Sequence, residues 1–299
     1  MLLLDSASLY YRAYFALPET MVGPDGQPVN AVRGFLDTVA ALARDRAPVR
    51  VIACWDDDWR PQWRVDLVPS YKTHRVLDEA EGTEETPDTL SPQIDILRTL
   101  LPHLGIPIVG ADGAEADDVI ATLAHCEPGT VDIASGDRDL VQLVDDRVTL
   151  LFTGGSSASR QGRPWDVITP GAAVERYGVP ASRYADLAVL RGDPSDGLPG
   201  VRGVGEKTAA ALIQAFGGLD GILAAAADAD SPRPMTPTVR QRLLESREEI
   251  LRAERVVRLA PDAGYGAMPD PIRPSSDALD IAAGFGVATS AQRVLDALT

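Results

Sequence analysis

Short apolar runs alternate with longer helical patterns through the first half of the chain, and this alternation most constrains the fold. The apolar runs cover 2–4, 49–53, 106–109, 131–134 and 148–152. Patterns with the spacing of amphipathic helices lie between them, at about 29–45, 92–102, 115–125 and 138–144. Such alternation is typical of βαβ units. We therefore expect an α/β fold with a parallel sheet and helices on both faces.

The second half of the chain shows helical patterns and no clear strand. One begins at Pro170, and others cover 181–190, 206–216 and 239–259. This change in texture predicts two domains, an α/β domain at 1–166 and a helical domain at 167–299. A long segment at about 57–91 interrupts the first domain. Loops of that length inside a compact domain are usually functional or disordered.

The charge and cysteine content limit the function classes. A net charge of −16 ordinarily argues against a nucleic-acid or anionic-membrane partner, unless many of the carboxylates gather at one site. Cys54 and Cys126 are the two cysteines, too few for a disulfide scaffold and without the spacing of a zinc site. Because we also find no signal peptide and no membrane-spanning run, we expect a cytoplasmic protein without a membrane partner.

Acidic residues follow four of the expected strands, namely Asp5, Asp56, Glu115 and Asp137. The carboxyl ends of neighbouring parallel strands meet at one edge, where ligands bind in open α/β sheets. The nearby acids Asp117, Asp118 and Asp139 would join the same edge. Each acid alone could be a helix cap or turn residue. Together they would repel one another without cations, which predicts a site for hard divalent ions suited to phosphodiester cleavage.

The segment at 57–91 places aromatic rings beside cations. Tyr71, Lys72 and Arg75 lie within about one helical turn, and Trp63 with Arg64 lies two turns earlier if a helix runs back that far. Rings that stack on bases and cations that hold phosphates are typical of a clamp for single strands. The alternative is a solvated lid whose charges do nothing specific. Lys72 is one of only two lysines in the chain, which favours a function.

A glycine-rich turn spans 192–208, before an alanine-rich helix. It is not a Walker A loop, because Glu206 separates Gly205 from Lys207, and its glycine spacing does not match a dinucleotide fingerprint. The amides at the start of the following helix could face an anion such as a DNA phosphate. The alternative is a purely structural turn between helices. Lys207, the second lysine, favours DNA binding.

These segments resemble the bacterial 5′-to-3′ exonuclease or flap endonuclease family, which includes the N-terminal nuclease domain of DNA polymerase I. The matching segments are 4–15, 30–35, 63–75, 115–118, 136–139 and 192–209, in the family's order. The resemblance implies a PIN-like parallel-sheet core with a helical arch at about 57–91. It also implies an all-helical DNA-binding domain with a helix-three-turn-helix motif at about 184–216. No polymerase-like sequence follows, which predicts a stand-alone nuclease.

The resemblance also assigns roles to individual residues. The implied metal-site acids are Asp5, Asp56, Glu115, Asp117, Asp118, Asp137, Asp139, Asp193 and Asp196. The implied catalytic cations that steer the phosphate are Lys72 and Arg75. The implied DNA-binding residues are Arg12, Arg64, Tyr71, Gly203, Gly205, Lys207 and Thr208. The chain departs from the family pattern in a run of acids at 56–58, in Arg138, Pro194 and Gly197, and in an acidic stretch after Arg75.

The expected function is a Mg²⁺- or Mn²⁺-dependent 5′-to-3′ exonuclease and flap endonuclease. Its expected substrates are DNA flaps, nicks and free 5′ ends, including RNA-primed ends and RNA–DNA hybrids. The resemblance further implies two or more divalent ions, a K⁺ ion at the helix-three-turn-helix turn, a functional partnership with a DNA polymerase and ligase, and a place at the nucleoid. Two alternatives stay open: a PIN-type ribonuclease, and a catalytically weak protein that binds DNA structures.

Overall fold

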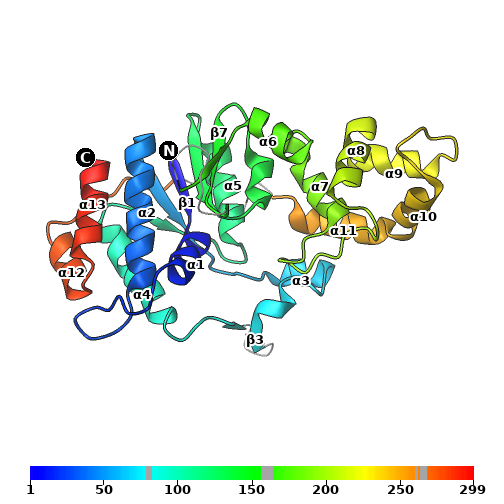
Figure 1. The fold of residues 1–299 in the computed structure, drawn as a ribbon. Helices are drawn as coiled ribbons and strands as arrows, with labels where there is room; N and C mark the ends of the chain where they lie inside the picture. Colours follow the sequence, from blue (N-terminus) through cyan, green and yellow to red (C-terminus); the bar gives the residue numbers. More distant parts are fainter. Residues whose placement is uncertain (79–82, 156–163, 260–261, 263–267) are drawn as a thin grey trace.

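The computed structural model describes residues 1–78, 83–155, 164–259, 262 and 268–299. At its centre is a six-stranded sheet in the order β5-β2-β1-β6-β7-β8 (Figure 1). The strands are β1 (Leu2–Asp5), β2 (Val51–Cys54), β5 (Ile108–Val109), β6 (Val131–Ser135), β7 (Val148–Phe152) and β8 (Asp166–Ile168). All neighbouring pairs are parallel except β7 with β8. The predicted parallel sheet is confirmed, and β8 is an antiparallel edge strand that the sequence patterns did not predict.

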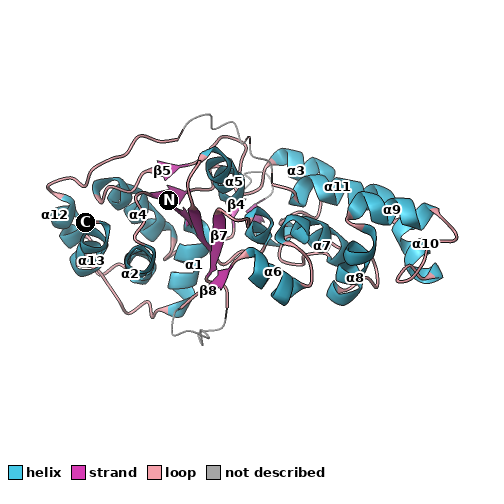
Figure 2. Ribbon diagram, turned by 90° about the horizontal axis from the view of Figure 1, so that it is seen from above, coloured by secondary structure: helices cyan, strands magenta, loops and turns pink. Residues whose placement is uncertain are grey.

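Helices cover both faces of the sheet because the inner strands are apolar on both sides. Leu3 packs into a core with α5 (Ala116–Cys126) and the helices of the second half. Leu2 and Leu4 face the opposite core with α1 (Ser6–Ala16), α2 (Asn30–Arg46) and α4 (Ser91–His103). Successive strand residues point to opposite faces, so β1 contributes to both cores. Figure 2 shows α5 and α2 on opposite sides of the strands.

The second half is helical in the described ranges. Its elements are α6 (Pro170–Tyr177), the 3-10 helix η3 (Ala181–Arg183), α7 (Tyr184–Arg191), α8 (Glu206–Phe216), α9 (Leu219–Ala227), α10 (Pro237–Glu245) and α11 (Arg247–Val257). The prediction of a single helix at 239–259 is wrong, because the segment forms two helices, α10 and α11, that are separated at Ser246. In these ranges no single helix is long and apolar enough to cross a membrane, although the sharply bent pair α8 and α9 together has that length and composition.

The last two helices return to the α/β part of the molecule. These are α12 (Ala278–Gly284) and α13 (Ala288–Leu298), and α13 lies beside α2 in Figure 1. Ala282 and Val294 are buried in the same core as Phe35 and Leu36 of α2. The domain boundaries expected from sequence stay a prediction. The structure adds that the end of the chain completes the core of the first part.

The segment at 57–91 is helical only in part. It contains α3 (Gln62–Leu67), the 3-10 helix η1 (Thr73–Arg75) and a small hairpin of β3 (Val76–Asp78) with β4 (Thr83–Glu84). A continuous helix from 63 to 75 does not form, because Pro69 lacks the amide that a helix needs and Lys72 has a left-handed φ of 48°. Part of the acidic stretch, 79–82, lies outside the described residues.

Candidate active site

A cavity of about 540 Å³ lies where β1, β2 and β6 end. Asp5 ends β1, Asp56 follows β2 by two residues, and Asp137 follows β6 by two residues. The acids that line the cavity are Asp5, Asp56, Glu84, Glu85, Glu115, Asp117, Asp137 and Asp193, and the basic residues are Lys72, His74, Arg75 and Arg138. The structure therefore brings six of the nine predicted metal-site acids to one cavity.

Ser135 organises the acids at the ends of β1 and β6. Its hydroxyl donates to Asp5 Oδ2 and accepts from the Asp137 amide at 2.8 Å. Asp5 Oδ1 accepts from the Ser8 amide at 3.2 Å and so caps α1. The Ser135 side chain is fully buried. The sequence analysis missed Ser135, although its place as the last residue of a buried strand between two acids was a usable signal.

Asp56 and Asp57 point to different surroundings. Asp56 Oδ1 accepts from the Ala116 amide at 2.8 Å, which attaches the end of β2 to the first turn of α5. Asp57 is exposed and lies 3.4 Å from Arg98 Nη2. Asp57 is not among the residues that line the cavity. Of the run at 56–58, Asp56 is therefore the acid placed to act in the site.

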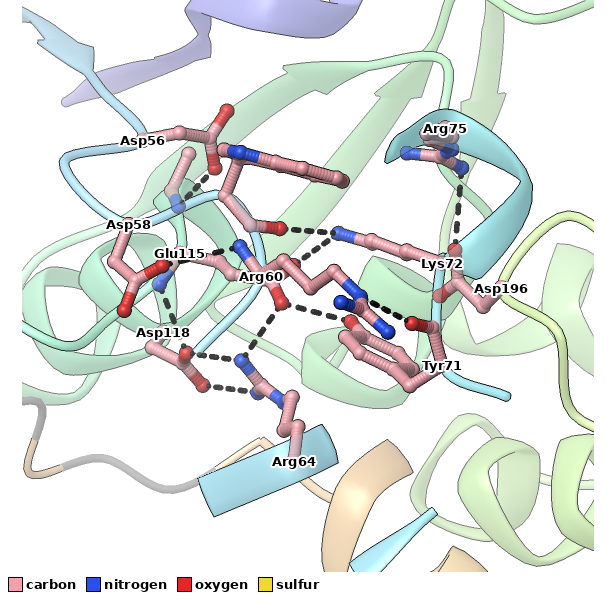
Figure 3. Close-up of polar contacts among 12 residues, drawn as sticks. Asp56, Asp58, Arg60, Arg64, Tyr71, Lys72, Arg75, Glu115, Asp118 and Asp196 are labelled. Carbon is pink, nitrogen blue, oxygen red and sulfur yellow. Dashed lines mark hydrogen bonds and ion pairs between the residues drawn. The ribbon is translucent and has the colours of Figure 1, made fainter. Parts of the chain in front are cut away.

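Glu115 is the centre of a buried polar network, shown in Figure 3. Its Oε1 accepts from Tyr71 Oη at 2.8 Å and lies 3.2 Å from Arg64 Nη1, and its Oε2 pairs with Lys72 Nζ. Arg64 also holds both oxygens of Asp118, at 2.8 and 2.7 Å. Asp118 in turn accepts from the Glu115 amide at 3.2 Å, as part of a capping box at the start of α5. Asp118 is thus engaged by Arg64 and lies away from the cavity.

The two remaining predicted acids, Asp139 and Asp196, lie behind the cavity wall. Both line a second, much smaller cavity together with Asp117 and Glu115. Asp139 Oδ1 is buried and has no hydrogen-bond partner in the described structure. Asp196 Oδ1 lies 3.2 Å from Arg75 Nη2. The structure therefore groups these two with the site but does not place them on the wall of the large cavity.

Burial and mutual repulsion raise the free energy needed to ionise these acids. Burial, helped by the charges of Asp56 and Asp137, raises the pKa of Asp5 to about 7. Burial also raises the pKa of Asp117, Asp137 and Asp139, and neighbouring carboxylates add to each shift. Cations among these groups would relieve the repulsion, and an all-oxygen donor set suits Mg²⁺ or Mn²⁺.

The donor set is spread out, however, and this bears on how an ion would be held. Within the described ranges no three His, Cys, Asp or Glu side chains are gathered closely enough to hold a metal ion on their own. Mg²⁺ usually keeps several waters and takes only one or two carboxylates directly. The unpartnered Asp139 Oδ1 is a further oxygen available behind the wall. The residues present therefore fit hydrated divalent ions better than a closed protein cage.

Lys72 and Arg75 are held at the cavity by specific contacts. Lys72 Nζ also donates to Trp59 O at 3.3 Å. Burial opposes the charged form of Lys72, but the Glu115 carboxylate holds its pKa well above the usual value. Arg75 Nη2 donates to Ser195 O at 2.8 Å. Both cations therefore line the same cavity as six of the predicted acids, and their role in steering the phosphate stays a prediction.

Two of the predicted DNA-binding residues are buried, and this corrects the sequence interpretation. Arg64 is 2% exposed and Tyr71 is 4% exposed, so neither presents a surface to DNA. The sequence interpretation placed Tyr71 within one helical turn of Lys72, and Arg64 two turns earlier, in a clamp for single strands. The chain instead turns after α3 and directs both side chains inward to Glu115. The sequence analysis also missed Arg60, whose Nε donates to Tyr71 O at 2.6 Å and holds this turn.

The other predicted DNA-binding residues stay accessible. Arg12 is half-buried on α1, with its Nη2 3.5 Å from Gly155 O. Gly203 and Gly205 are exposed at the turn before α8, Lys207 is exposed in the first turn of α8, and Thr208 beside it is partly exposed. Gly203 has a φ of 72° and lies against the Arg242 guanidinium, which adds an unpredicted cation to this turn. The DNA contacts expected of these residues stay a prediction.

Comparisons with known proteins cover the whole chain. A family model described as the 5′-3′ exonuclease N-terminal resolvase-like domain matches residues 1–178, and one described as the 5′-3′ exonuclease C-terminal SAM fold matches residues 179–277. A 5′-3′ exonuclease of Streptomyces coelicolor is 49% identical over 311 residues, with 100% of both chains covered. DNA polymerase I of Mycobacterium bovis is 38% identical over 279 residues, which span 91% of this chain and 28% of the polymerase.

A solved structure is also similar. It is that of the bacteriophage T5 flap endonuclease, in a pseudo-enzyme-product complex with DNA and metal ions. It superposes with a TM-score of 0.64 at 20% identity, over 99% of this chain and 98% of the other. At this identity the likeness concerns the fold, and it confirms the arrangement of an α/β core followed by a helical part.

Replacing Arg64 tests whether its ion pairs support the fold. Arg64→Met leaves the buried Asp118 and Glu115 without this cation, so we expect the free energy of unfolding to fall by about 3–5 kcal/mol. As a control, Arg176→Met removes a half-exposed pair with Asp166 and should cost about 0–1 kcal/mol. Urea unfolding of both variants measures this. Equal losses of unfolding free energy in the two variants would show that the buried ion pairs of Arg64 stabilise the fold no more than a surface pair does.

The raised pKa of Asp5 predicts a pH dependence of stability in metal-free protein. Folded protein keeps this proton up to about pH 7, whereas an unfolded chain loses it near the ordinary value of 3.8. Because the folded state binds more protons between these values, stability should fall as pH rises from about 4 to 7. Asp5→Asn should remove this part of the slope in urea unfolding with a chelator present. An unchanged slope in the variant would contradict the assignment.

Proposed function

This chain belongs to the 5′-3′ exonuclease family, and we propose that it hydrolyses phosphodiester bonds of DNA at 5′ flaps, nicks and free 5′ ends. The observation that carries this proposal is the cavity that six of the predicted metal-site acids line together with Lys72 and Arg75. Acids that attract divalent ions and cations that attract phosphate oxygens line the same cavity, and Lys72 pairs directly with the cavity acid Glu115. This pairing suits a phosphodiester, which must be both held and attacked.

The cavity acids would hold Mg²⁺ or Mn²⁺. We assign this role to Asp5, Asp56, Glu115, Asp117, Asp137 and Asp193, with Asp139 and Asp196 behind them and Asp118 as a support for Glu115 through Arg64. Bound ions of this kind supply an activated water and stabilise charge on the phosphate oxygens. Two or more ions fit the number of acids better than one, because a single ion would leave most of the buried charge uncompensated.

The cations have a separate role in this proposal. Lys72 is buried, remains charged through Glu115, and points into the cavity that the acids line. Arg75 is more exposed and lies at the same wall. A phosphate entering the cavity would meet both groups, and their charge would offset the charge that develops on its oxygens. We therefore assign Lys72 and Arg75 to phosphate steering.

The helical half would hold the duplex. The exposed Gly203 and Gly205 precede α8, Lys207 lies in its first turn, and helix amides there can face a phosphate. We assign DNA contacts to this turn, to Thr208 and to Arg12, and a K⁺ ion to the turn. Arg64 and Tyr71 support the site from inside instead. The proposed substrates also include RNA-primed ends and RNA–DNA hybrids.

The products define further partners. Removing a 5′ flap or a primer leaves a gap or a nick, which needs a DNA polymerase and a ligase to repair. We therefore propose a functional partnership with such enzymes and a place at the nucleoid in the cytoplasm. The similarity to a part of DNA polymerase I supports a link between this nuclease activity and DNA synthesis.

A flap-cleavage assay tests the proposed function. The protein is incubated with Mn²⁺ and a 5′-labelled DNA flap, and in parallel with single-stranded RNA of the same sequence. We expect cleavage of the flap and its loss in a variant with both Asp137→Ala and Asp139→Ala. Cleavage of the RNA alone would favour a PIN-type ribonuclease, and tight flap binding without turnover would favour a DNA-structure-binding protein.

Adjacent aspartates provide a matched pair of variants. Asp56→Ala removes a cavity acid and should lower kcat by more than about 100-fold, beyond the loss typical of an outer partner. Asp57→Ala removes an exposed acid that lies beside Arg98 and should leave kcat within about 2-fold, because surface pairs contribute little. Steady-state kinetics on the flap substrate separates the two. The reverse order of effects would overturn the choice of Asp56.

A further inference from the structure

The turn that follows Asp193 docks on the base of the 57–91 insertion. We call residues 70–75 the arch base and residues 195–197 the docking turn. Three consecutive carbonyls of the docking turn each accept one hydrogen bond from the arch base. Arg75 Nη2 donates to Ser195 O at 2.8 Å, the Lys72 amide to Asp196 O at 3.0 Å, and Ser70 Oγ to Gly197 O at 2.7 Å.

Gly197 makes this close approach possible. Its φ is 72°, a left-handed conformation that side chains rarely adopt. A Cβ atom at this position would lie 2.0 Å from Ser70 O and 3.4 Å from the Lys72 amide nitrogen. Since the nearest obstacle is a backbone carbonyl, it cannot rotate away as a flexible side chain could. In this chain both the conformation and the space therefore favour glycine over a residue with a side chain.

The docking turn is rigidly linked to the acid of the cavity wall. The backbones of Asp193 and Leu198 bond to each other in both directions, at 3.0 and 2.8 Å. Asp193 Oδ1 accepts from the Ser195 amide at 2.9 Å. On the other side of the contact, Arg60 holds the arch base through Tyr71 O. A shift of the docking turn would therefore move Asp193 relative to Lys72 and Arg75.

We propose that Gly197 is a positioning residue, which docks the arch base so that Lys72 and Arg75 face the cavity acids before DNA binds. Lys72 itself has a left-handed φ of 48°, and its amide bond to Asp196 O lies directly at the dock. The catalytic consequence rests on the proposed function. The docking contact itself is independent of the proposed function, because it is present in the protein without substrate.

Hydrogen exchange of DNA-free protein tests the docking contact directly. The Lys72 amide should be protected in unmodified protein, and Gly197→Ala should raise its exchange rate at least 10-fold while β6 and β7 stay protected. Gly26→Ala is the matched control, because Gly26 also has a positive φ, 81°, but has open space around it. Fast exchange of the Lys72 amide in unmodified protein would overturn the dock, whether or not the protein cleaves DNA.

Flap kinetics tests the positioning role. Gly197→Ala should lower kcat by about 100-fold, as a misplacement of about 1 Å does, with KM within about 3-fold. Ser70→Ala removes one of the three hydrogen bonds and should lower kcat by a smaller factor, about 3-fold or more. This second variant provides the test if Gly197→Ala does not fold. Faster exchange with unchanged kcat would overturn the role. Inactive unmodified protein would instead count against the proposed function.

Discussion

The burial of several carboxylates beside one another is the constraint on which the rest of the site depends. Asp5, Asp117, Asp137 and Asp139 all have raised pKa values because burial and neighbouring acids oppose their ionisation. Such an arrangement costs free energy and persists only where other parts of the fold hold it in place. The sheet does this by ending three adjacent strands at the same edge, and Ser135 does it by joining the acids of two strands.

Internal cations relieve part of this repulsion and connect distant parts of the chain. Arg64 pairs with Glu115 and Asp118 and also donates to Val256 O at the end of α11. Lys72 pairs with Glu115 from the arch base. The insertion and the helical half are therefore tied to α5 through the same buried carboxylate. The remaining negative charge at the cavity is what divalent ions would balance, so the net charge of −16 does not exclude DNA as a substrate.

The sequence predicted the sheet and the cavity acids well because both follow from short-range patterns. Apolar runs indicated the parallel strands. An acid at the carboxyl end of a parallel strand lies at the ligand-binding edge of the sheet, whatever the order of the strands. The direction of Arg64 and Tyr71 was not predictable in the same way. The sequence interpretation assigned both to DNA contacts, but Pro69 and the left-handed Lys72 turn the chain, and both side chains are buried.

Contacts between segments far apart in the chain were also outside the reach of sequence patterns. The docking of Gly197 on Ser70, the packing of α13 on α2 and the pairing of β8 with β7 join residues whose proximity no local pattern encodes. Asp118 is instructive, since its place three residues after Glu115 matches a capping box as well as a metal ligand. Only the position of Arg64 shows which of these roles the fold gives it.

The central claim is that the buried acids of the cavity hold divalent ions. A crystal of the protein soaked in Mn²⁺ and measured at the manganese absorption edge tests it most directly. The account predicts anomalous peaks inside the cavity, with oxygens of Asp5, Asp56, Glu115, Asp117, Asp137 or Asp193 as direct or water-mediated ligands. Ordered manganese found only at exposed surface acids, with the cavity free of peaks, would contradict it.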